Sequence, residues 1–181
     1  MNVRVSLYGV WFAFSLISCQ SAKVSVLDKS PSFTLSSYET FGFYETDATG
    51  ALSENYERNM DFLKEEIAKH MVFRGLMRND ESPELKINLG VVVEQKDQTR
   101  ETNLVTDPGT FNYIGQQRYT WKSEVIKVGS YRKGTVTVHL VDATKNEAVW
   151  VGVSERILAE REDRLMQTIM DGVEEMFDQI P

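Results

Sequence analysis

Five apolar residues alternate with other side chains between positions 85 and 93, and this segment restricts the possible folds more than any other. They are Leu85, Ile87, Leu89, Val91 and Val93. Apolar residues at a strict period of two indicate a β-strand with one buried face. Because Lys86 and Asn88 lie between them, the other face of the sheet is expected to contact water, as antiparallel sheets allow.

Two amphipathic helices are predicted to cover the dry face of that sheet. The first is expected to follow an N-cap at Ser53 and to end near Gly75, a residue suited to the left-handed position after a helix. Its apolar residues recur at steps of three and four, and they are Tyr56, Met60, Leu63, Ile67 and Met71. The second helix is expected from about Glu160, with an apolar stripe of Leu165, Ile169, Val173, Met176 or Phe177, and Ile180.

Further strands are indicated on both sides of the first helix. The extended or alternating segments are 23–27, 40–44, 119–128, 135–141 and 148–153, with Gly129 expected to end the third of them. A turn at 142–146 joins the last two as a hairpin. Residues 94–117 are polar and are expected to form a loop. The fold class predicted is α+β, a mostly antiparallel sheet with two amphipathic helices packed on one face.

The N-terminal segment has the three parts of a secretory signal peptide. Arg4 supplies a positive charge, an apolar run spans 5–17, and the small Ser18 precedes Cys19. The run is shorter than the ~20 residues of a membrane-spanning helix. Its end, Leu16-Ile17-Ser18-Cys19, resembles the bacterial lipobox, whose cysteine receives a diacylglyceryl group before a peptidase cuts ahead of it. An uncleaved anchor, or a core helix that ends in cysteine, is the alternative.

Cleavage at that site would leave a lipoprotein held to a membrane through Cys19. The predicted parts are a signal peptide at 1–18, a lipidated tether at 19–23 and a single α+β domain at 24–181. Two or more acyl chains anchor a protein stably, whereas one anchors it marginally. Gln20 stands where an aspartate retains many lipoproteins in the inner membrane. The expected location is therefore the outer membrane, facing the periplasm.

Composition and motifs argue against several classes of function. A net charge of −7 argues against nucleic acid or anionic lipid as the main partner, because these need a basic surface. Cys19 is the only cysteine, so its acylation leaves no thiol for a disulfide, a nucleophile or a metal site. Neither His70 nor His139 has a second histidine at metal-ligand spacing. We predict no cofactor, no metal and no catalytic residue.

The basic and aromatic segment 116–133 is the most distinctive candidate for binding a partner. It holds five basic residues against the single acid Glu124, on a chain that is acidic elsewhere. The candidate partner-binding residues are Arg118, Tyr119, Trp121, Lys122, Tyr131 and Arg132. Such side chains suit an envelope protein or a cell-wall glycan. In the alternative interpretation, which strand aromatics generally favour, the aromatic residues pack in strands and the basic residues balance acids of neighbouring helices.

Two functions are compatible with these features. The first is a non-catalytic binding or accessory domain at the membrane, for example a subunit that assists an envelope transporter or synthase. The second is a periplasmic hydrolase whose carboxylate pair the spacing does not identify. The charged run 155–164 alternates in sign and is expected to be solvated, so it does not supply such a pair.

The order of segments resembles a known family of bacterial lipoproteins. After the lipobox comes Ser37-Tyr38-Glu39-Thr40-Phe41, then a long helix, an alternating strand and a hairpin with Val141-Asp142-Ala143-Thr144-Lys145 at its turn. A final helix ends near Pro181. This pattern is similar to the lipoproteins of the domain of unknown function 4136 family. The resemblance implies an α+β fold and an envelope location, and it implies no activity.

Overall fold

The alternating segment 85–93 belongs to an inner strand of a mixed sheet. The computed structural model describes residues 23–102 and 123–181, which form six strands and two α-helices. The strands are β1 (Lys23–Lys29), β2 (Thr40–Gly50), β3 (Met77–Arg78), β4 (Leu85–Glu101), β5 (Val125–Asp142) and β6 (Glu147–Leu158). The helices are α1 (Tyr56–Phe73) and α2 (Glu162–Phe177), with a short 3-10 turn η1 (Leu35–Ser37).

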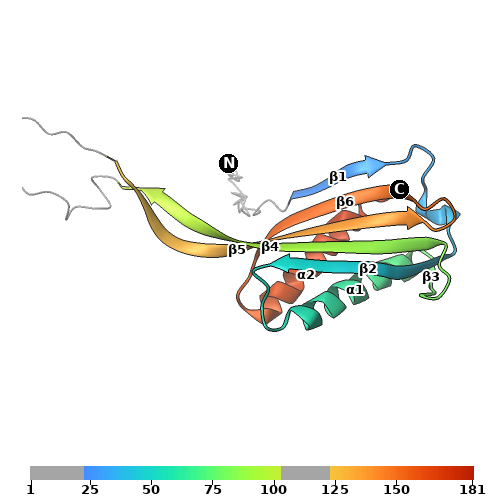
Figure 1. Ribbon diagram of the computed structural model, residues 1–181, viewed down its shortest axis with the longest axis horizontal. Coiled ribbons are helices and arrows are strands. Elements are labelled where there is room, and N and C mark those ends of the chain that lie inside the picture. Colours follow the sequence, from blue (N-terminus) through green and yellow to red (C-terminus); the bar gives the residue numbers. More distant parts are fainter. Residues whose placement is uncertain (1–22, 103–122) are drawn as a thin grey trace, which may run out of the picture.

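The strands lie in the order β1-β6-β5-β4-β2-β3, and both helices cover one face of the sheet (Figure 1). The α+β class is therefore confirmed. The pairs β1–β6, β6–β5 and β5–β4 are antiparallel, whereas β4–β2 and β2–β3 are parallel. The prediction of a mostly antiparallel sheet was wrong for these two pairs. The reason is that α1 carries the chain back along the sheet between β2 and β4, which makes them parallel.

The helix boundaries differ slightly from those predicted. The N-cap of α1 is Asn55 and not Ser53, whose carbonyl instead accepts a hydrogen bond from the amide of Tyr56 at 3.1 Å. At the other end Gly75 has a φ of +94°, as predicted for the residue beyond the C-cap. The second helix begins at Glu162. Its predicted apolar stripe lies on the side that faces the sheet.

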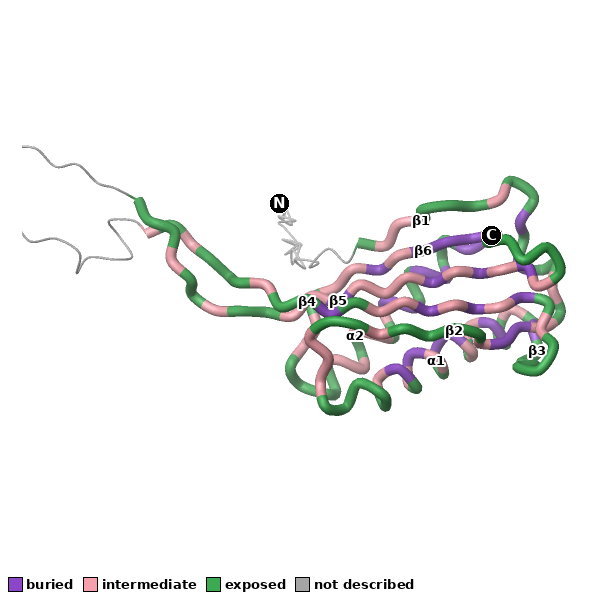
Figure 2. The backbone as a smooth tube through the Cα atoms, viewed as in Figure 1, coloured by how far each residue is buried: buried purple, intermediate pink, exposed green. Residues whose placement is uncertain are grey.

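One end of the helix–sheet interface is densely packed, and we call it the closed end. It is defined by Phe41, Met71, Leu140, Trp150 and Phe177, whose side chains are all fully or almost fully buried. Arg74 joins the C-terminal parts of the two helices there, donating to the carbonyls of Phe177 at 2.6 Å and Ile180 at 3.0 Å. The buried residues of α1 and the sheet in this region are visible in Figure 2.

The opposite end of the interface, the open end, holds the N-termini of both helices and the first residue of β1. Strands β4 and β5 continue past it. The pairing of β4 with β2 ends at Val93, and the pairing of β5 with β6 ends at Arg132. Beyond these residues 94–101 and 125–131 pair only with each other, forming a two-stranded arm that projects from the body (Figure 1).

The arm corrects two expectations about the chain. Residues 94–101 were expected to lie in a loop, but they continue β4 as a strand. Gly129 was expected to end a strand, but β5 runs through it, and a bulge opposite Gln98 and Thr99 absorbs the irregularity. Polar side chains are compatible with these strands because most of the residues on the arm are exposed to water.

Candidate functional site: an apolar cavity with two arginines

A cavity of about 110 Å³ lies between the two helices and the sheet at the open end. Its lining comes from α1, α2 and the four strands β2, β4, β5 and β6. The apolar side chains include Met60, Leu63, Val91, Val136, Ile169 and Met176. Several of the lining side chains, among them Arg132, Leu158 and Leu165, are only half-buried, so the cavity reaches the surface near the base of the arm.

The cavity exists because small residues meet where the two layers face each other. Ala48, Gly134, Ser154 and Gly172 all contribute to its wall. At the closed end the corresponding space holds the ring of Trp150, which lies over Gly152 so closely that a Cβ added there would be 2.0 Å from Cη2. The described lining of the cavity contains no tryptophan and no phenylalanine. The predicted core residues Leu165 and Ile169 consequently remain half-buried.

Arg156 is the main polar feature of the wall. Its side chain is 15% exposed, and Nη2 lies 2.9 Å from Oε2 of Glu175, close enough for an ion pair but without hydrogen-bond alignment. The Nε of Arg156 is buried and has no hydrogen-bond partner among the described residues. It lies beside Gly172, where an added Cβ would be 3.0 Å away. A buried N–H donor therefore stands beside an apolar space.

The burial of Arg156 corrects the expectation that the whole run 155–164 is solvated. In β6 the residues Trp150, Gly152, Ser154 and Arg156 occupy alternate positions, so they share the side that faces the helices. This alternation is present in the sequence, but the charge of Arg156 and its neighbours concealed it. Continuing the period of two beyond Ser154 would have identified Arg156.

The structure describes two of the six candidate partner-binding residues. Arg132 lines the cavity, next to Leu158. Tyr131 and Arg132 are neighbours in β5, so their side chains point to opposite faces of the strand. Tyr131 and Arg132 therefore do not form one patch. The other four, Arg118, Tyr119, Trp121 and Lys122, lie outside the described residues, as does Cys19.

Two further basic residues of that segment have acidic partners on neighbouring strands. Lys127 Nζ lies 2.5 Å from Oδ1 of Asp97, and Lys133 Nζ lies 2.9 Å from Oε2 of Glu155. The hydrogen bond between Lys133 and Glu155 raises the pKa of the lysine and lowers the pKa of the carboxyl. For these two lysines the balancing acids lie on the neighbouring strands β4 and β6, and not on helices as the alternative interpretation expected.

Within residues 23–102 and 123–181, neither a carboxylate in the cavity lining nor a metal-ligand cluster is found. The described lining of the cavity contains no aspartate or glutamate. The same ranges contain no group of three histidine or acidic side chains able to hold a metal ion. His70 stacks on the ring of Phe177, with a centroid separation of 4.9 Å, and His139 is half-buried in β5. Neither helix of this part of the chain is long and apolar enough to cross a membrane.

The carboxyl of Asp142 is held in its ionised form for a structural reason. It accepts hydrogen bonds from the amides of Thr144 and Lys145 in the β5–β6 turn, both at 2.9 Å, and from the hydroxyl of Tyr38 at 3.1 Å. The amide of Lys145 contributes most to lowering the pKa of Asp142. Burial, together with the hydrogen bond to Asp142, raises the pKa of Tyr38 to about 12. The hydrogen bond between Tyr38 and Asp142 connects the end of η1 to the β5–β6 turn, away from the cavity.

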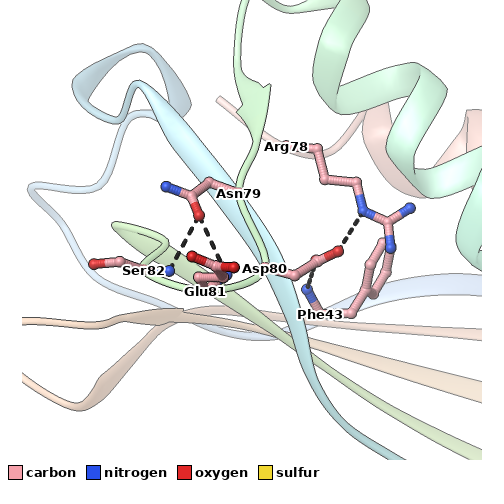
Figure 3. Close-up of polar contacts among 6 residues, drawn as sticks. All are labelled: Phe43, Arg78, Asn79, Asp80, Glu81 and Ser82. Carbon is pink, nitrogen blue, oxygen red and sulfur yellow. Dashed lines mark hydrogen bonds and ion pairs between the residues drawn. The ribbon is translucent and has the colours of Figure 1, made fainter.

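A second polar cluster completes the outer edge of β2 (Figure 3). Asp80 accepts a hydrogen bond from the amide of Phe43 at 3.1 Å and one from Nε of Arg78 at 2.8 Å. The guanidinium of Arg78 lies over the ring of Phe43, 5.2 Å from its centroid. Asn79 accepts from two amides of its own loop. Because Asp80 accepts the hydrogen bond of the Phe43 amide, that amide is not available to pair with a further strand. The cluster therefore blocks strand addition at this sheet edge.

The fold is similar to distant solved structures. A PelC dodecamer from Paraburkholderia phytofirmans is 11% identical with a TM-score of 0.48, and the match covers 88% of this chain and 98% of that one. A PDZ domain protein from Parabacteroides distasonis is 16% identical with a TM-score of 0.48, covering 86% of this chain and 34% of that one. A protein described as a neuraminyllactose-binding hemagglutinin homolog from Helicobacter pylori is 11% identical, with a TM-score of 0.44 and coverages of 84% and 88%.

These likenesses are too distant to assign a function. No curated protein is similar enough in sequence to count as a match. A family model does match, and it covers residues 25–181. Its description is "Domain of unknown function (DUF4136)", which confirms the resemblance seen in the 37–41 segment and the hairpin. The chain belongs to the DUF4136 family.

Proposed function

We propose that this chain is a non-catalytic binding or accessory domain, tethered to the bacterial envelope by acylated Cys19. The observation that carries the proposal is the cavity at the open end. Its wall is almost wholly apolar, its charged members are Arg132 and Arg156, and its described lining offers no carboxylate for general acid–base chemistry. Apolar cavities with few, placed polar groups are typical of small-molecule binding sites.

The position at which β1 begins supports the same proposal. Lys23, the first residue of β1, pairs with Glu155, the neighbour of Arg156 in β6. Lys23 follows Cys19 by four positions, a span of at most ~14 Å in a fully extended chain. A lipid on Cys19 would therefore hold the open end, with its cavity and arm, beside the membrane. The outer membrane is the proposed location, because the residue after Cys19 is Gln20 and not aspartate.

The anchor is tested by replacing its only candidate cysteine. Cys19→Ala is expected to abolish incorporation of labelled palmitate and to leave the precursor uncut by the lipoprotein peptidase. Gln20→Asp serves as the control for location, because it should keep the lipid but move the protein to the inner-membrane fraction. Labelling of the Cys19→Ala variant would refute the anchor.

Binding at the cavity is tested on protein taken from the envelope. The mature protein is released from envelope membranes and its mass is measured in the native state, alongside Val136→Phe, in which a ring would fill the cavity. The wild type is expected to carry a small molecule that the Val136→Phe protein lacks. The same mass for both proteins, with no adduct, would remove the cavity from the proposed function.

A protein or glycan partner is proposed for the end of the arm. The arm carries Tyr131, which is 37% exposed, and it leads to the four candidate residues between 118 and 122. Crosslinking of intact envelopes is expected to recover a consistent partner, with loss on Trp121→Ala and Arg118→Ala. Lys127→Ala is the matched control, because this lysine already pairs with Asp97. Equal recovery from all variants would contradict the assignment.

A further inference from the structure

The cavity combines a narrow apolar space with a buried guanidinium, and we propose that it binds the alkyl chain of a free fatty acid. This inference rests on the proposed function, because it names the ligand class of the same site. The alkyl chain would lie between α1, α2 and the sheet. The carboxylate would lie against Arg156, with Arg132 as the second cation of the site.

The dimensions of the cavity favour a single chain. Its volume is about 110 Å³, while an engineered apolar cavity of roughly 150 Å³ in another protein stays dry and binds benzene. The space therefore accommodates several methylene groups of one chain and is too small for the two chains of a phospholipid. Leu158 and Leu165 are half-buried and lie where the cavity reaches the surface. The remaining methylene groups of a longer alkyl chain can therefore extend out of the cavity there.

The unpartnered donor of Arg156 favours a carboxylate. Its Nε is buried without a hydrogen-bond partner among the described residues. A carboxylate can accept from Nε and from a terminal nitrogen together, in the fork geometry that arginine offers. Glu175, the present ion-pair partner, has a side chain that is 49% exposed, so it can return to water when a ligand carboxylate replaces it.

The distribution of charge favours one local anion over an anionic surface. The whole chain carries a net charge of −7, which repels anionic membranes and polymers. Inside the cavity the described lining has two arginines and no acid, so the sign is reversed there. A cationic amphiphile would be repelled by both arginines, and an amphiphile without an acceptor oxygen would leave Nε of Arg156 unpartnered.

The test uses a decanoic acid that carries a photoreactive diazirine on its chain. The mature lipidated protein, held in phosphatidylcholine nanodiscs, is irradiated with this probe, and the labelled peptides are mapped by mass spectrometry. Labelling is expected on Leu63, Val136 and Ile169. Unlabelled decanoate should compete, whereas methyl decanoate, decylamine and phosphatidylglycerol added to the nanodiscs should not. Labelling confined to residues outside the cavity, or equal competition by the methyl ester, would overturn the proposal.

Variants separate the roles of the chain and the head group. Arg156→Gln is expected to weaken competition by decanoate at least tenfold while leaving the fold, followed by circular dichroism, unchanged. Arg132→Gln should weaken it less, about threefold. Val136→Phe should abolish labelling, and Lys127→Gln on the arm should not alter it. If Arg156→Gln fails to fold, Arg132→Gln and Val136→Phe still decide the outcome, and unchanged labelling in both would refute the site.

The ligand class and the proposed function can fail separately. If protein from the envelope carries a molecule that Val136→Phe loses, but the decanoate probe does not label the cavity, the binding function stands and the fatty acid is wrong. If neither a bound molecule nor labelling is found, both proposals are wrong.

Discussion

The two ends of the helix–sheet interface are built from the same elements but pack differently. At the closed end the rings of Phe41, Trp150 and Phe177 fill the space between the layers. At the open end the wall is made of smaller residues such as Ala48 and Gly172, and a cavity remains. The layers are continuous from one end to the other, so the difference arises from side-chain size and not from topology. The same two layers therefore form a filled core at one end and leave a cavity at the other.

Polar contacts follow the same division. At the closed end Arg74 holds the carbonyls that end α2, and the amide of Leu35 donates to the carbonyl of Pro181 at 3.0 Å. At the open end the helix N-termini are joined by an ion pair between Arg58 and Glu162, whose side chains are both more than half exposed. Exposed ion pairs contribute little to stability. The closed end is therefore expected to carry most of the free energy of unfolding.

The largest expected effect comes from removing the central ring of the closed end. Trp150→Ala should lower the free energy of unfolding by about 3–5 kcal/mol, because the ring is fully buried and leaves a cavity. Leu165→Ala at the open end is the matched comparison and should cost about 1 kcal/mol, since Leu165 is half-buried. Urea unfolding measures both. Equal losses would show that the two ends do not differ in stability.

A smaller effect is expected from adding one methyl group beside that ring. Gly152→Ala would bring a Cβ to 2.0 Å from Trp150, and the overpacking should cost about 2–3 kcal/mol. Gly90→Ala is the control, because its Cβ would find the nearest atom at 3.9 Å. Thermal unfolding of the two variants should differ clearly. A well-folded Gly152→Ala protein with unchanged stability would contradict the packing described for Trp150.

The Tyr38–Asp142 pair makes the closed end sensitive to pH. Asp142→Asn should cost about 1–2 kcal/mol, because it weakens the turn hydrogen bonds and the contact with Tyr38. In the wild type the Asp142 contribution is present above the ordinary carboxyl pKa and is lost as pH falls through the lowered folded pKa. The Tyr38 contribution is present below pH 10 and is lost as pH rises towards about 12.

Spectrophotometric titration of tyrosinate measures this second change. In the wild type Tyr38 should ionise with a pKa of about 12, and Tyr38→Phe should remove that step. In Asp142→Asn the pKa of Tyr38 should fall only part of the way, because burial, the largest cause of the raised pKa, remains after the neighbouring negative charge is removed. An unshifted titration in Asp142→Asn would show that the charge of Asp142 does not contribute to the raised pKa of Tyr38.

At the open end a larger side chain is expected to stabilise the protein. Val136→Phe should raise the free energy of unfolding by about 0.5–1 kcal/mol, because the ring enters existing space. Val136→Phe should thus raise the free energy of unfolding while Gly152→Ala lowers it, and this contrast would distinguish the two ends most directly. Loss of stability in Val136→Phe relative to the ligand-free wild type, measured by urea unfolding, would mean that the ring does not fit the space.

The smallest effect is expected on the arm. Lys127→Ala removes an exposed ion pair with Asp97 and should change the free energy of unfolding by less than about 0.5 kcal/mol. Residues 125–131 pair only with 94–101, so the body should not respond. A large loss, seen by thermal unfolding, would indicate that the arm stabilises the sheet.

Local patterns in the sequence predicted much of the fold. The alternation at 85–93 located β4, the turn at 142–146 located the β5–β6 hairpin, and the steps of three and four located both helices. Each pattern can be recognised in a short window of sequence, because a strand or helix repeats its side-chain directions within a few positions. The family resemblance rested on the same local segments.

The candidate site was only partly predictable. Arg132 was singled out, but for an expected surface patch, and Arg156 was assigned to a solvated run. Their common position depends on β5 and β6 lying side by side in a particular register, and on Gly172 of α2 approaching Arg156. Register and helix placement join residues that are far apart in the chain, so no local window contains them.

The sequence by itself determined the amphipathic elements, the α+β class and the family, because these follow from the periodicity and identity of nearby residues. Only the tertiary structure decided that β2 and β4 are parallel, that β4 and β5 extend into an arm, and that Arg156 is buried. It also decided where empty space remains. Packing depends on which side chains meet across the layers, and small residues leave a cavity only where they face one another.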